Sequence, residues 1–452
     1  MKILIAGCGQ VGQTLAQELS AEGHDLTLMD SDPQVLEMGM ERYDVIAIQG
    51  NCASMQTLHA ANVEMADLLI ACTGSDELNL LCCMTAHALN PHLHTIARIR
   101  NHEYVEQTYR MRDTFALSMI FNPEQQAAQE IERLLRFPGF LKRDSFAKGR
   151  VEIVELRVDA DSRLCNVPLS ALNAIVKCKV LVCTVLREGQ AITPDGRFVL
   201  RAGDRIFVTA PSENLALLLK NLGIVQHKIR NVMVVGGGTL CYYLANLLQN
   251  SSIGMTVIEA DRARCVELAS AFPRVEVICG DAREQSLLES EGISSADALI
   301  ALTGLDELNL LISLYGQSCR IPQIVTRLEN LTETGITRDL TLGSVICPRR
   351  LCCNSIVRYV RAMQNQEGAA VAVHSIADGQ AEALEFVVDE HTLHCGEPLR
   401  KLKLKKNVLL AAITSGGKTE IPSGDSTFAI GDSVVVVETS DDVILQLNDI
   451  FA

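Results

Sequence analysis

The sequence predicts an α/β protein made of two similar halves, each with a parallel-sheet domain followed by a smaller α+β domain. Three observations carry this prediction. A glycine-rich turn links an apolar strand to a helix near the start of the chain, the same landmarks recur about 230 residues later, and short strand-like runs follow each copy. An apolar strand that runs through glycines into a helix is typical of a βαβ unit, whose strands are parallel.

The first thirty residues form one complete βαβ unit in this prediction. The expected elements are a buried strand at 3–6, a helix at 14–22 and a second strand at 26–29. The turn between the first strand and the helix reads Gly7-Cys8-Gly9-Gln10-Val11-Gly12. Gly7 permits the tight turn, Gly9 lets the backbone approach a pyrophosphate, and Gly12 allows the helix to pack closely on the strand. The turn therefore predicts a nucleotide site, with the pyrophosphate at the positive end of the helix.

Asp30 ends the second strand and supports this prediction. An acid at this place can accept hydrogen bonds from both ribose hydroxyls of an adenosine and would repel a 2′-phosphate. NAD(H) is therefore preferred over NADP(H). ATP and ADP carry the same free ribose, so they remain alternative ligands of the same site.

The rest of the first parallel-sheet domain alternates helices and strands. The expected elements are helices at 33–42, 55–61 and 123–140 and strands at 45–48, 66–71 and 95–100. Asn51 and Cys52 follow one strand. Thr73 and Gly74 follow the next strand, so both pairs lie at strand ends, where α/β folds bind ligands. Thr73 and the aspartate three residues later are expected to cap the next helix. Arg98, in a buried run, needs an anion or an acid as its partner.

The same landmarks recur in order in the second half. The matched positions are Gly7 with Gly236, Asp30 with Glu259, Asn51 with Asp281, Arg98 with Arg327, and segment 73–79 with segment 303–309. Each pair is separated by 229 or 230 residues. So many matches at a nearly constant spacing do not arise by chance, so the sequence indicates a tandem duplication.

The glycine turn of the second half is less complete. Gly236 and Gly238 keep the first two glycine positions, but Cys241 stands where the third glycine is expected. Cysteine is small, so the helix can still pack on the strand after a modest shift. Glu259 keeps the acid for the ribose. A second nucleotide site is predicted here. The alternative is that the second domain is a purely structural duplicate that binds no nucleotide.

Each parallel-sheet domain is followed by a region of short strands and turns, which predicts a small α+β domain. The expected strands of the first copy lie at 151–158, 180–186 and 205–209. The predicted domains are 1–140, 141–226, 227–365 and 366–452. The helix-like stretch 123–140, which ends in Pro138-Gly139, and its counterpart at 351–363 suit a crossover between subunits, although an ordinary linker is equally compatible.

The composition disfavours several classes of function. A formal charge of −15 argues against nucleic acid as a partner, because phosphate binding needs a basic face. None of the sixteen cysteines is spaced as Cys-x-x-Cys, so they are expected to be small core residues of a reducing compartment, and no metal site is predicted. No apolar run approaches the roughly 18 to 20 residues that span a bilayer, and the first residues lack a signal peptide. A cytoplasmic protein without direct membrane insertion is expected.

Catalytic groups are sparse in this sequence. No Tyr-x-x-x-Lys pair occurs, and no Ser/His/Asp or paired-carboxylate set can be placed beside the glycine turns. The small domains repeat no histidine, lysine or tyrosine at matching positions. A protein without enzymatic activity is therefore predicted, and an NAD-dependent oxidoreductase with a duplicated cofactor domain is the alternative.

Taken together, these motifs resemble the TrkA family of Trk potassium-uptake regulatory proteins, whose chains carry two tandem RCK (KTN) modules. The resemblance covers essentially the whole chain and implies an α/β fold in which a Rossmann-like domain and a small α+β domain are duplicated in tandem. It implies a first site lined by Gly7, Gly9, Gln10, Val11, Gly12, Asp30, Asn51, Cys52, Thr73, Gly74 and Arg98. It implies a second site lined by Gly236, Gly238, Thr239, Glu259, Asp281, Ala282, Thr303, Gly304 and Arg327.

The resemblance also implies a function. Such proteins are cytosolic gating-ring subunits that bind NAD(H), ATP or ADP and assemble on a Trk or Ktr membrane subunit that conducts potassium, so a peripheral place at the inner face of the cell membrane is expected. Two modules per chain imply a homotetramer with eight modules. Arg98 or Arg100 would sense the terminal phosphates, and nucleotides of different charge would favour different hinge angles. Two departures stand out: Asn51-Cys52 replaces the Asp-Ala pair seen at 281–282, and Cys241 replaces glycine.

Overall fold

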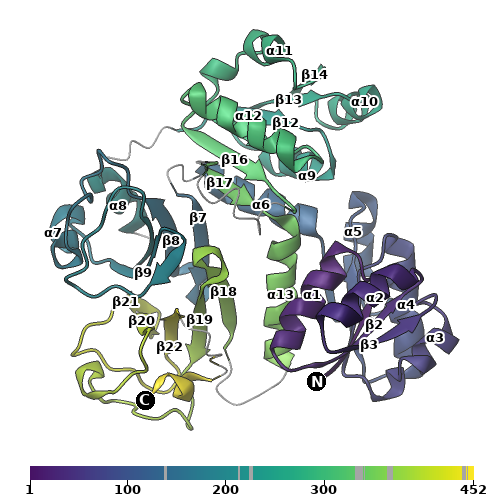
Figure 1. The fold of residues 1–452 in the computed structure, drawn as a ribbon, viewed down its shortest axis with the longest axis horizontal. Helices are drawn as coiled ribbons and strands as arrows, with labels where there is room; N and C mark the ends of the chain where they lie inside the picture. Colours follow the sequence, from purple (N-terminus) through teal and green to yellow (C-terminus); the bar gives the residue numbers. More distant parts are fainter. Residues whose placement is uncertain are drawn as a thin grey trace. The chain divides into compact units, whose positions relative to one another are not determined.

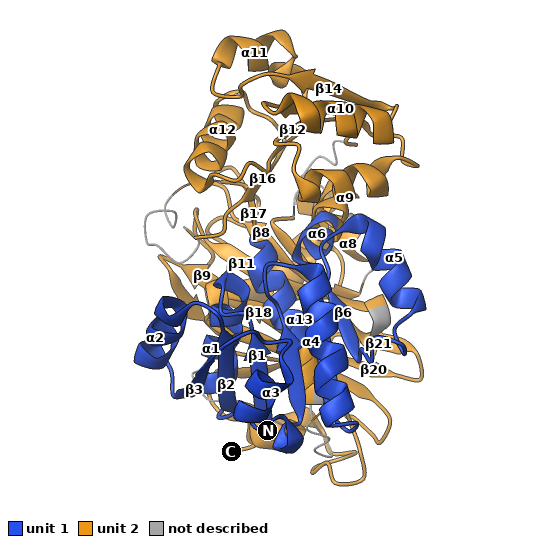
Figure 2. Ribbon diagram, turned by 90° about the vertical axis from the view of Figure 1, so that its right-hand side faces the viewer, with its two compact units in different colours: residues 1–128, 347–357 blue, residues 129–346, 358–452 orange. Residues whose placement is uncertain are grey.

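The computed structural model describes residues 1–136, 140–211, 214–222, 228–330, 340, 342–363, 370–439, 444 and 446–452. Four sheets follow one another along the chain (Figure 1). The chain divides into two compact units, residues 1–128 with 347–357 and residues 129–346 with 358–452 (Figure 2). The domain boundaries predicted at 226/227 and 365/366, and the predicted helix end at Pro138-Gly139, involve residues outside those described.

The first sheet is a doubly wound parallel sheet. Its strands are β1 (Lys2–Ala6), β2 (Asp25–Asp30), β3 (Val45–Gln49), β4 (Leu68–Ala71), β5 (His94–Arg98) and β6 (Met119–Phe121). The strand order is β3-β2-β1-β4-β5-β6, and every pair is parallel. This order places the ends of β1 and β4 side by side, at the point where α/β folds bind ligands. The Rossmann-like prediction is confirmed for this half.

Helices cover this sheet close to where the sequence predicts them. They are α1 (Gln10–Ala21), α2 (Pro33–Arg42), α3 (Met55–Ala60), α4 (Asp76–Leu89) and α5 (His102–Arg110). The predicted start of α1 at residue 14 is wrong, because Gly9 is the N-cap and the helix begins at once. The prediction placed the helix after the last glycine, since glycine disfavours a helix interior. Tertiary packing around Gly12 overrides that preference.

The second parallel sheet repeats the first. Its strands are β12 (Asn231–Val235), β13 (Gly254–Glu259), β14 (Val275–Cys279), β15 (Ala298–Ala301), β16 (Gln323–Arg327) and β17 (Ser344–Ile346). The order β14-β13-β12-β15-β16-β17 matches that of the first sheet strand for strand. The helices are α9 (Thr239–Leu248), α10 (Arg262–Ala271), α11 (Gln285–Ser290) and α12 (Asp306–Ser318). The predicted tandem duplication is therefore present in the fold.

The two remaining sheets are antiparallel and also repeat each other. The first contains β7 (Lys142–Phe146), β8 (Val151–Arg157), β9 (Leu181–Arg187), β10 (Gln190–Ile192) and β11 (Arg205–Pro211). The second contains β18 (Ala372–Ile376), β19 (Ala381–Val387), β20 (Val408–Ser415), β21 (Lys418–Glu420) and β22 (Ser433–Glu438). Helices α7 (Leu172–Val176) and α8 (Leu215–Leu222) accompany the first sheet. The sequence did not predict β7, whose polar residues 142–145 hide its strand pattern.

The two small domains lie in the same unit and share one hydrophobic core. Its residues include Phe146, Ile153 and Phe207 of the first small domain and Ile376, Ala383 and Val435 of the second. An ion pair between Arg205 and Asp378 at 2.7 Å adds to this contact. Burial of large apolar side chains between two sheets is a strongly stabilising form of packing, so the two small domains form one paired body.

Two longer helices follow the parallel sheets, α6 (Pro123–Arg136) and α13 (Pro348–Met363). The first half of α13 belongs to the same unit as the first parallel sheet. There Ser355 lies 3.4 Å from Gln126 of α6, and the Cys353 thiol contacts the carbonyl of Val11. The first half of α13, from the second half of the chain, thus packs on the first Rossmann-like domain, as a crossover helix does. Among the described residues, no helix combines the length and apolar character needed to cross a bilayer.

Candidate functional site

Two glycines of the first turn are required by the protein's own packing. Gly7 has a φ of +96°, and a Cβ there would lie 2.7 Å from the backbone nitrogen of Thr73. A Cβ on Gly12 would lie 2.0 Å from the carbonyl oxygen of Gly7. Real side chains do not approach the backbone so closely, so both positions hold the turn against β4 and α1.

Gly9 has no such packing role. A Cβ built on Gly9 would have no described atom within 4 Å, and the same is true of Gly238 in the second half. Both glycines have a negative φ and are the N-caps of α1 and α9, which among the described residues have no side-chain cap. The helices α2, α4, α5 and α10 are capped by a side chain, whereas α3, α11 and α12 also lack a side-chain cap in the described part of the chain but have no glycine at the N-cap. An uncapped helix start beside an open glycine fits a bound phosphate, whose oxygens would satisfy the first-turn N–H groups.

Asp30 is held in place by the turn itself. Its carboxylate accepts hydrogen bonds from the backbone N–H of Cys8 at 2.7 Å and of Asp32 at 3.0 Å. In the second half, the Glu259 carboxylate accepts from the N–H of Gly237 and from that of Asp261 at 2.7 Å. Each carboxylate has lone pairs for further donors, so ribose hydroxyls can be added without breaking these bonds.

The loop between β4 and α4 is fixed by an asparagine. Asn79 accepts from the backbone N–H and the hydroxyl of Thr73 at 2.8 and 2.7 Å, and its side-chain amide donates to the carbonyl of Arg98 at 2.9 Å. Asn309 makes the same three bonds to Thr303 and Arg327. A single buried side chain in each half therefore joins the ends of two neighbouring strands.

The predicted cap of α4 is wrong in its residues. Ser75 is the N-cap and accepts from the N–H of Leu78. Asp76 instead accepts from the backbone N–H groups of Arg100 and Asn101, both at 2.8 Å. The signal for these roles was present, since Asp-Glu-Leu-Asn recurs unchanged in the second half, but spacing alone does not separate a cap from a loop anchor.

Arg98 brings a positive charge to the site. One guanidinium nitrogen donates to the carbonyl of Thr73, while the Nε atom is buried and has no hydrogen-bond partner among the described residues. A buried donor without an acceptor is costly by about 1–3 kcal/mol. An anionic ligand at the ends of β4 and β5 would supply the acceptor. Arg100 also donates to this loop, to the carbonyl of Gly74 at 2.6 Å.

The remaining predicted residues of the first site lie at the end of β3. Asn51 accepts from the N–H of Ala53 at 3.0 Å and stays exposed. Cys52 is 4% exposed, and its carbonyl accepts from the Cys82 thiol at 3.2 Å. Its side chain belongs to the hydrophobic core of this domain, so a contact of Cys52 with a ligand would come from its backbone.

The charge at the phosphate end differs between the halves. Arg327 forms an ion pair with Glu329 at 3.1 Å, and Glu329 stands where the first half has Arg100. Two arginines in the first site are thus replaced by an arginine and a glutamate in the second. Asp281 likewise pairs with Arg283, and this hydrogen-bonded pairing lowers the pKa of Asp281 to about 2. The second site carries less net positive charge for phosphates.

Burial disfavours ionisation of three thiols near the turns. Burial raises the pKa of Cys72 to about 12 and that of Cys241 to about 12. Burial, with the charge of Asp30 beside it, also raises the pKa of Cys8. These thiols stay protonated near neutral pH, and a neutral thiol is a poor nucleophile. Cys241 is fully buried in α9 and fills the place where the first half has Gly12.

Comparisons with known proteins agree with this geometry. The TrkA-N domain model matches residues 3–120 and 232–348, and the TrkA-C domain model matches residues 153–223. The chain is 31% identical to the Trk system potassium uptake protein TrkA homolog of Archaeoglobus fulgidus over all of both chains. It is 29% identical to TrkA of Haemophilus influenzae, over 99% of this chain and 96% of that protein. TrkA of Vibrio alginolyticus is 31% identical over 96% of this chain and 95% of its own.

Solved structures show the same fold. The GsuK RCK domain superposes with a TM-score of 0.62 over 97% of this chain and 92% of that chain, at 16% identity. The GsuK channel bound to NAD superposes with a TM-score of 0.61 over 97% and 77%, at 17% identity. The full-length relatives and the two matched N-domains lead to one conclusion: the chain belongs to the TrkA family of Trk system potassium uptake proteins.

Proposed function

We propose that this chain is the nucleotide-binding regulatory subunit of a Trk- or Ktr-type potassium uptake system. The observation that carries the proposal is the pair of open glycines, Gly9 and Gly238, at uncapped helix starts beside an anchored acid. The protein's own packing does not explain these glycines, whereas a bound pyrophosphate does. The full-length resemblance to TrkA proteins supports the potassium uptake system as the setting.

The ligands we propose are NAD(H), ATP and ADP. Asp30 and Glu259 would accept hydrogen bonds from the ribose hydroxyls, and both acids disfavour a 2′-phosphate. The GsuK channel, which shares the fold, is described as bound to NAD in one structure and to ADP in another. Gly7, Gly9 and Gly12 with Gln10 and Val11 would surround the pyrophosphate in the first site, and their counterparts from Gly236 to Thr239 would do so in the second.

The first site is proposed to favour the more highly charged nucleotides. Arg98 and Arg100 give it two positive charges, whereas Glu329 neutralises Arg327 in the second site. Thr73, Gly74 and Arg98 would contact terminal phosphates, and a nucleotide without them would leave the buried Nε of Arg98 unsatisfied. Binding of different nucleotides would thereby favour different states of the protein, by the difference in their affinity for each state.

The protein is proposed to sense its nucleotides without converting them. The titratable thiols next to the turns stay neutral, and the groups anchored there are occupied in fixing the loops. Incubation of the pure protein with NADH and candidate carbonyl substrates tests this point. Stable NADH absorbance is expected, and turnover would favour the oxidoreductase alternative.

The assembly is proposed to be a homotetramer of eight modules on the cytoplasmic face of a membrane potassium subunit. The experiment that tests the function is rubidium uptake by cells that express the chain with its membrane subunit. Uptake should change when the cellular ATP/ADP ratio is altered, and a variant with both Asp30→Ala and Glu259→Ala should lose that response. Uptake that ignores nucleotides in the unmodified protein would overturn the proposal.

A further inference from the structure

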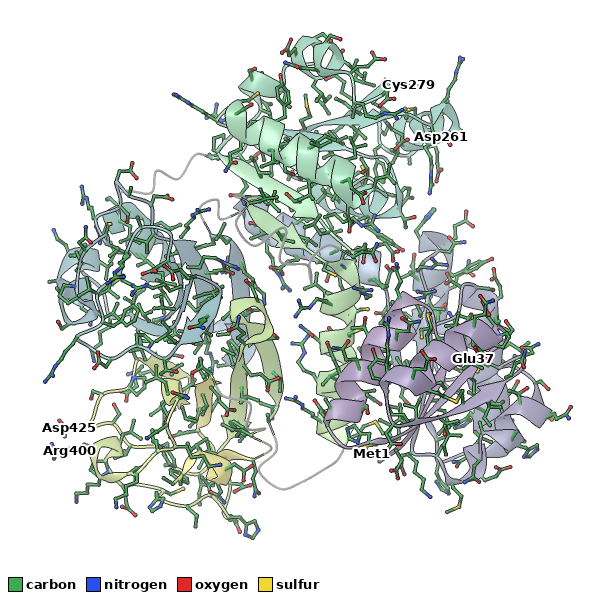
Figure 3. All side chains as sticks on the ribbon, viewed as in Figure 1. Met1, Glu37, Asp261, Cys279, Arg400 and Asp425 are labelled. Carbon is green, nitrogen blue, oxygen red and sulfur yellow. The ribbon has the colours of Figure 1, made fainter. Side chains whose placement is uncertain are left out.

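Cys265 and Cys279 lie against each other in the second Rossmann-like domain. Cys265 is in the first turn of α10, which spans Arg262–Ala271. Cys279, labelled in Figure 3, ends β14 and pairs in register with Glu259. The Cys265 thiol donates to the carbonyl of Glu259 at 3.4 Å, and the Cys279 thiol lies 4.0 Å from the carbonyl of Ala260. The two thiols are also close enough for Cys279 to affect the ionisation of Cys265.

The two thiols differ in access. Cys279 is exposed, whereas Cys265 is 7% exposed. Burial and then the hydrogen bond with Cys279 raise the pKa of Cys265 to about 11. A small disulfide can therefore reach Cys279 first, with Cys265 behind it as the resolving thiol.

The first half of the chain has no counterpart of this pair. Leu36 stands on α2 where Cys265 stands on α10, and Gln49 pairs with Asp30 as Cys279 pairs with Glu259. The two nucleotide sites otherwise share their acid and their glycines. Any redox effect of the pair should therefore be confined to the second site.

We propose that Cys265 and Cys279 form a reversible disulfide that weakens nucleotide binding at the second site. The effect on binding rests on the proposed function, whereas formation of the disulfide rests on the contact of the two thiols alone.

The chemistry is thiol–disulfide exchange with a low-molecular-weight disulfide such as oxidised glutathione. The Cys279 thiolate attacks the small disulfide, which forms a mixed disulfide and releases one small thiolate. Cys265 then loses its proton to water and attacks the Cys279 sulfur, which releases the second small thiolate. The two cysteines are oxidised and one small disulfide is reduced to two thiols. Dithiothreitol reduces the protein disulfide back to two thiols.

The disulfide would act on the site through the backbone next to Glu259. Bond formation brings the sulfur atoms from non-bonded contact to about 2.05 Å. Both sulfurs lie against the carbonyls of Glu259 and Ala260, so the first turns of α10 and the end of β14 must draw together around them. The Glu259 carboxylate is aligned by the N–H group of Gly237 in the glycine turn and by that of Asp261, two residues further along the chain. A shift of about 1 Å in such a site is enough to weaken binding.

The test uses full-length protein with the first site silenced by Asp30→Ala, so that NADH titrates the second site alone. Protein reduced with dithiothreitol is compared by calorimetry with protein oxidised by glutathione disulfide, and alkylated peptides are mapped by mass spectrometry. Expected results are a peptide crosslinked between Cys265 and Cys279, a threefold or larger loss of affinity, and full recovery on reduction.

Matched variants make the result specific. Cys265→Ser and Cys279→Ser should each abolish the crosslink and the change in affinity, whereas Cys395→Ser, which removes another exposed thiol, should keep both. The first site, measured in Glu259→Ala, should be indifferent to oxidation. Glutathione left on Cys279 without a crosslink, or a crosslink with unchanged affinity, would overturn the inference. Failure of the reduced protein to bind NADH at this site would instead overturn the proposed function there.

Discussion

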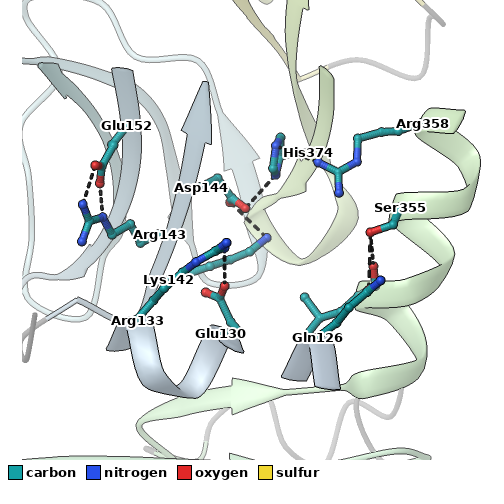
Figure 4. A network of polar contacts seen from close by, with 11 residues as sticks. Gln126, Glu130, Arg133, Lys142, Arg143, Asp144, Glu152, Ser355, Arg358 and His374 are labelled. Atoms are coloured by element: carbon teal, nitrogen blue, oxygen red, sulfur yellow. Dashed lines mark hydrogen bonds and ion pairs between the residues drawn. The ribbon is translucent and has the colours of Figure 1, made fainter. Parts of the chain in front are cut away.

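Asp144 and His374 occupy equivalent positions in the two halves of the chain, and their side chains meet. Asp144 is the middle residue of β7 and His374 is the middle residue of β18. The carboxylate Oδ1 lies 2.9 Å from the imidazole Nδ1 (Figure 4). A position that meets its own copy marks the axis of a two-fold contact. The duplication has thus made the two sides of this contact complementary, with an acid on one side and a base on the other.

Charged neighbours surround this pair. Lys142 lies 3.3 Å from the carboxylate of Asp144, and Arg358 lies 3.2 Å from the second ring nitrogen of His374. Burial alone would raise the pKa of Asp144, but Lys142 and His374 outweigh burial and hold it below its usual value. Asp144 is therefore ionised near neutral pH.

Replacement of one member of this pair should destabilise the paired small domains. His374→Asp puts two carboxylates in contact in a mostly buried place, and the free energy of unfolding should fall by roughly 3 kcal/mol. Urea denaturation followed by circular dichroism measures the change.

The swapped double variant, Asp144→His with His374→Asp, is the control. It restores one acid and one imidazole and places the new carboxylate beside Arg358, so it should recover part of the lost stability. A double variant no more stable than His374→Asp would contradict a pairwise contact.

Glu130 should give the protein a pH-dependent stability. Burial, and then the charge of Asp144, raise its pKa from 4.5 to about 7. Between these values the folded state keeps a proton that the unfolded state has lost, so stability falls as pH rises from about 4.5 to about 7. Glu130→Gln should flatten that decline and be more stable than the unmodified protein at pH 8, by up to roughly 3 kcal/mol at about 1.4 kcal/mol per pKa unit.

Melting temperatures measured from pH 5 to pH 8 check this prediction. Glu132→Gln changes the same charge two residues away on the same helix and should keep the pH dependence of the unmodified protein. Equal pH profiles for Glu130→Gln and the unmodified protein would show that Glu130 does not titrate in this range.

Replacement by alanine should lower stability at Gly12 and nucleotide affinity at Gly9. Gly12→Ala puts a Cβ 2.0 Å from the carbonyl of Gly7 and should cost about 2 kcal/mol of stability or more. Gly9→Ala meets no described atom within 4 Å, so its stability should stay within about 0.5 kcal/mol, while NADH affinity at the first site falls at least tenfold. Thermal melts and calorimetry separate the two effects. A Gly9→Ala protein that binds normally would remove the main support for a phosphate at α1.

Residue 329 should set the charge preference of the second site. Glu329→Arg removes the partner of Arg327 and recreates the two arginines of the first site, so ATP affinity at the second site should rise about tenfold. Glu329→Gln frees Arg327 without adding a charge and should give a smaller gain. Competition between ATP and NADH, measured in an Asp30→Ala background, tests whether ATP affinity rises from Glu329 to Glu329→Gln to Glu329→Arg. An unchanged ATP affinity in both variants would place the phosphates elsewhere.

The sequence predicts the Rossmann-like domains well because their signals are local and repeated. Buried strands, glycine turns and terminal acids each have a physical reason to appear at fixed spacing, and two copies confirm each other. The paired small domains were less predictable. β7 and β18 gain their stability from a core that joins residues more than two hundred positions apart, which no local pattern reveals.

The candidate sites show the same limit. Asp30 and Glu259 were predicted from spacing, and the structure gives them matching backbone anchors. The roles of Asn79 and Asp76 as loop anchors were missed, because a side chain that bonds to a neighbouring strand looks like a helix cap in the sequence. The ion pair between Arg327 and Glu329 could have been found, since the repeat aligns Glu329 with Arg100.

The central claim is that each half of the chain holds one nucleotide site organised around its own acid. Calorimetric titration of the reduced full-length protein with NADH tests it most directly. We expect two binding events per chain in the unmodified protein, one in Asp30→Ala, the other in Glu259→Ala, and none in the double variant. Unchanged binding in both single variants would contradict the claim.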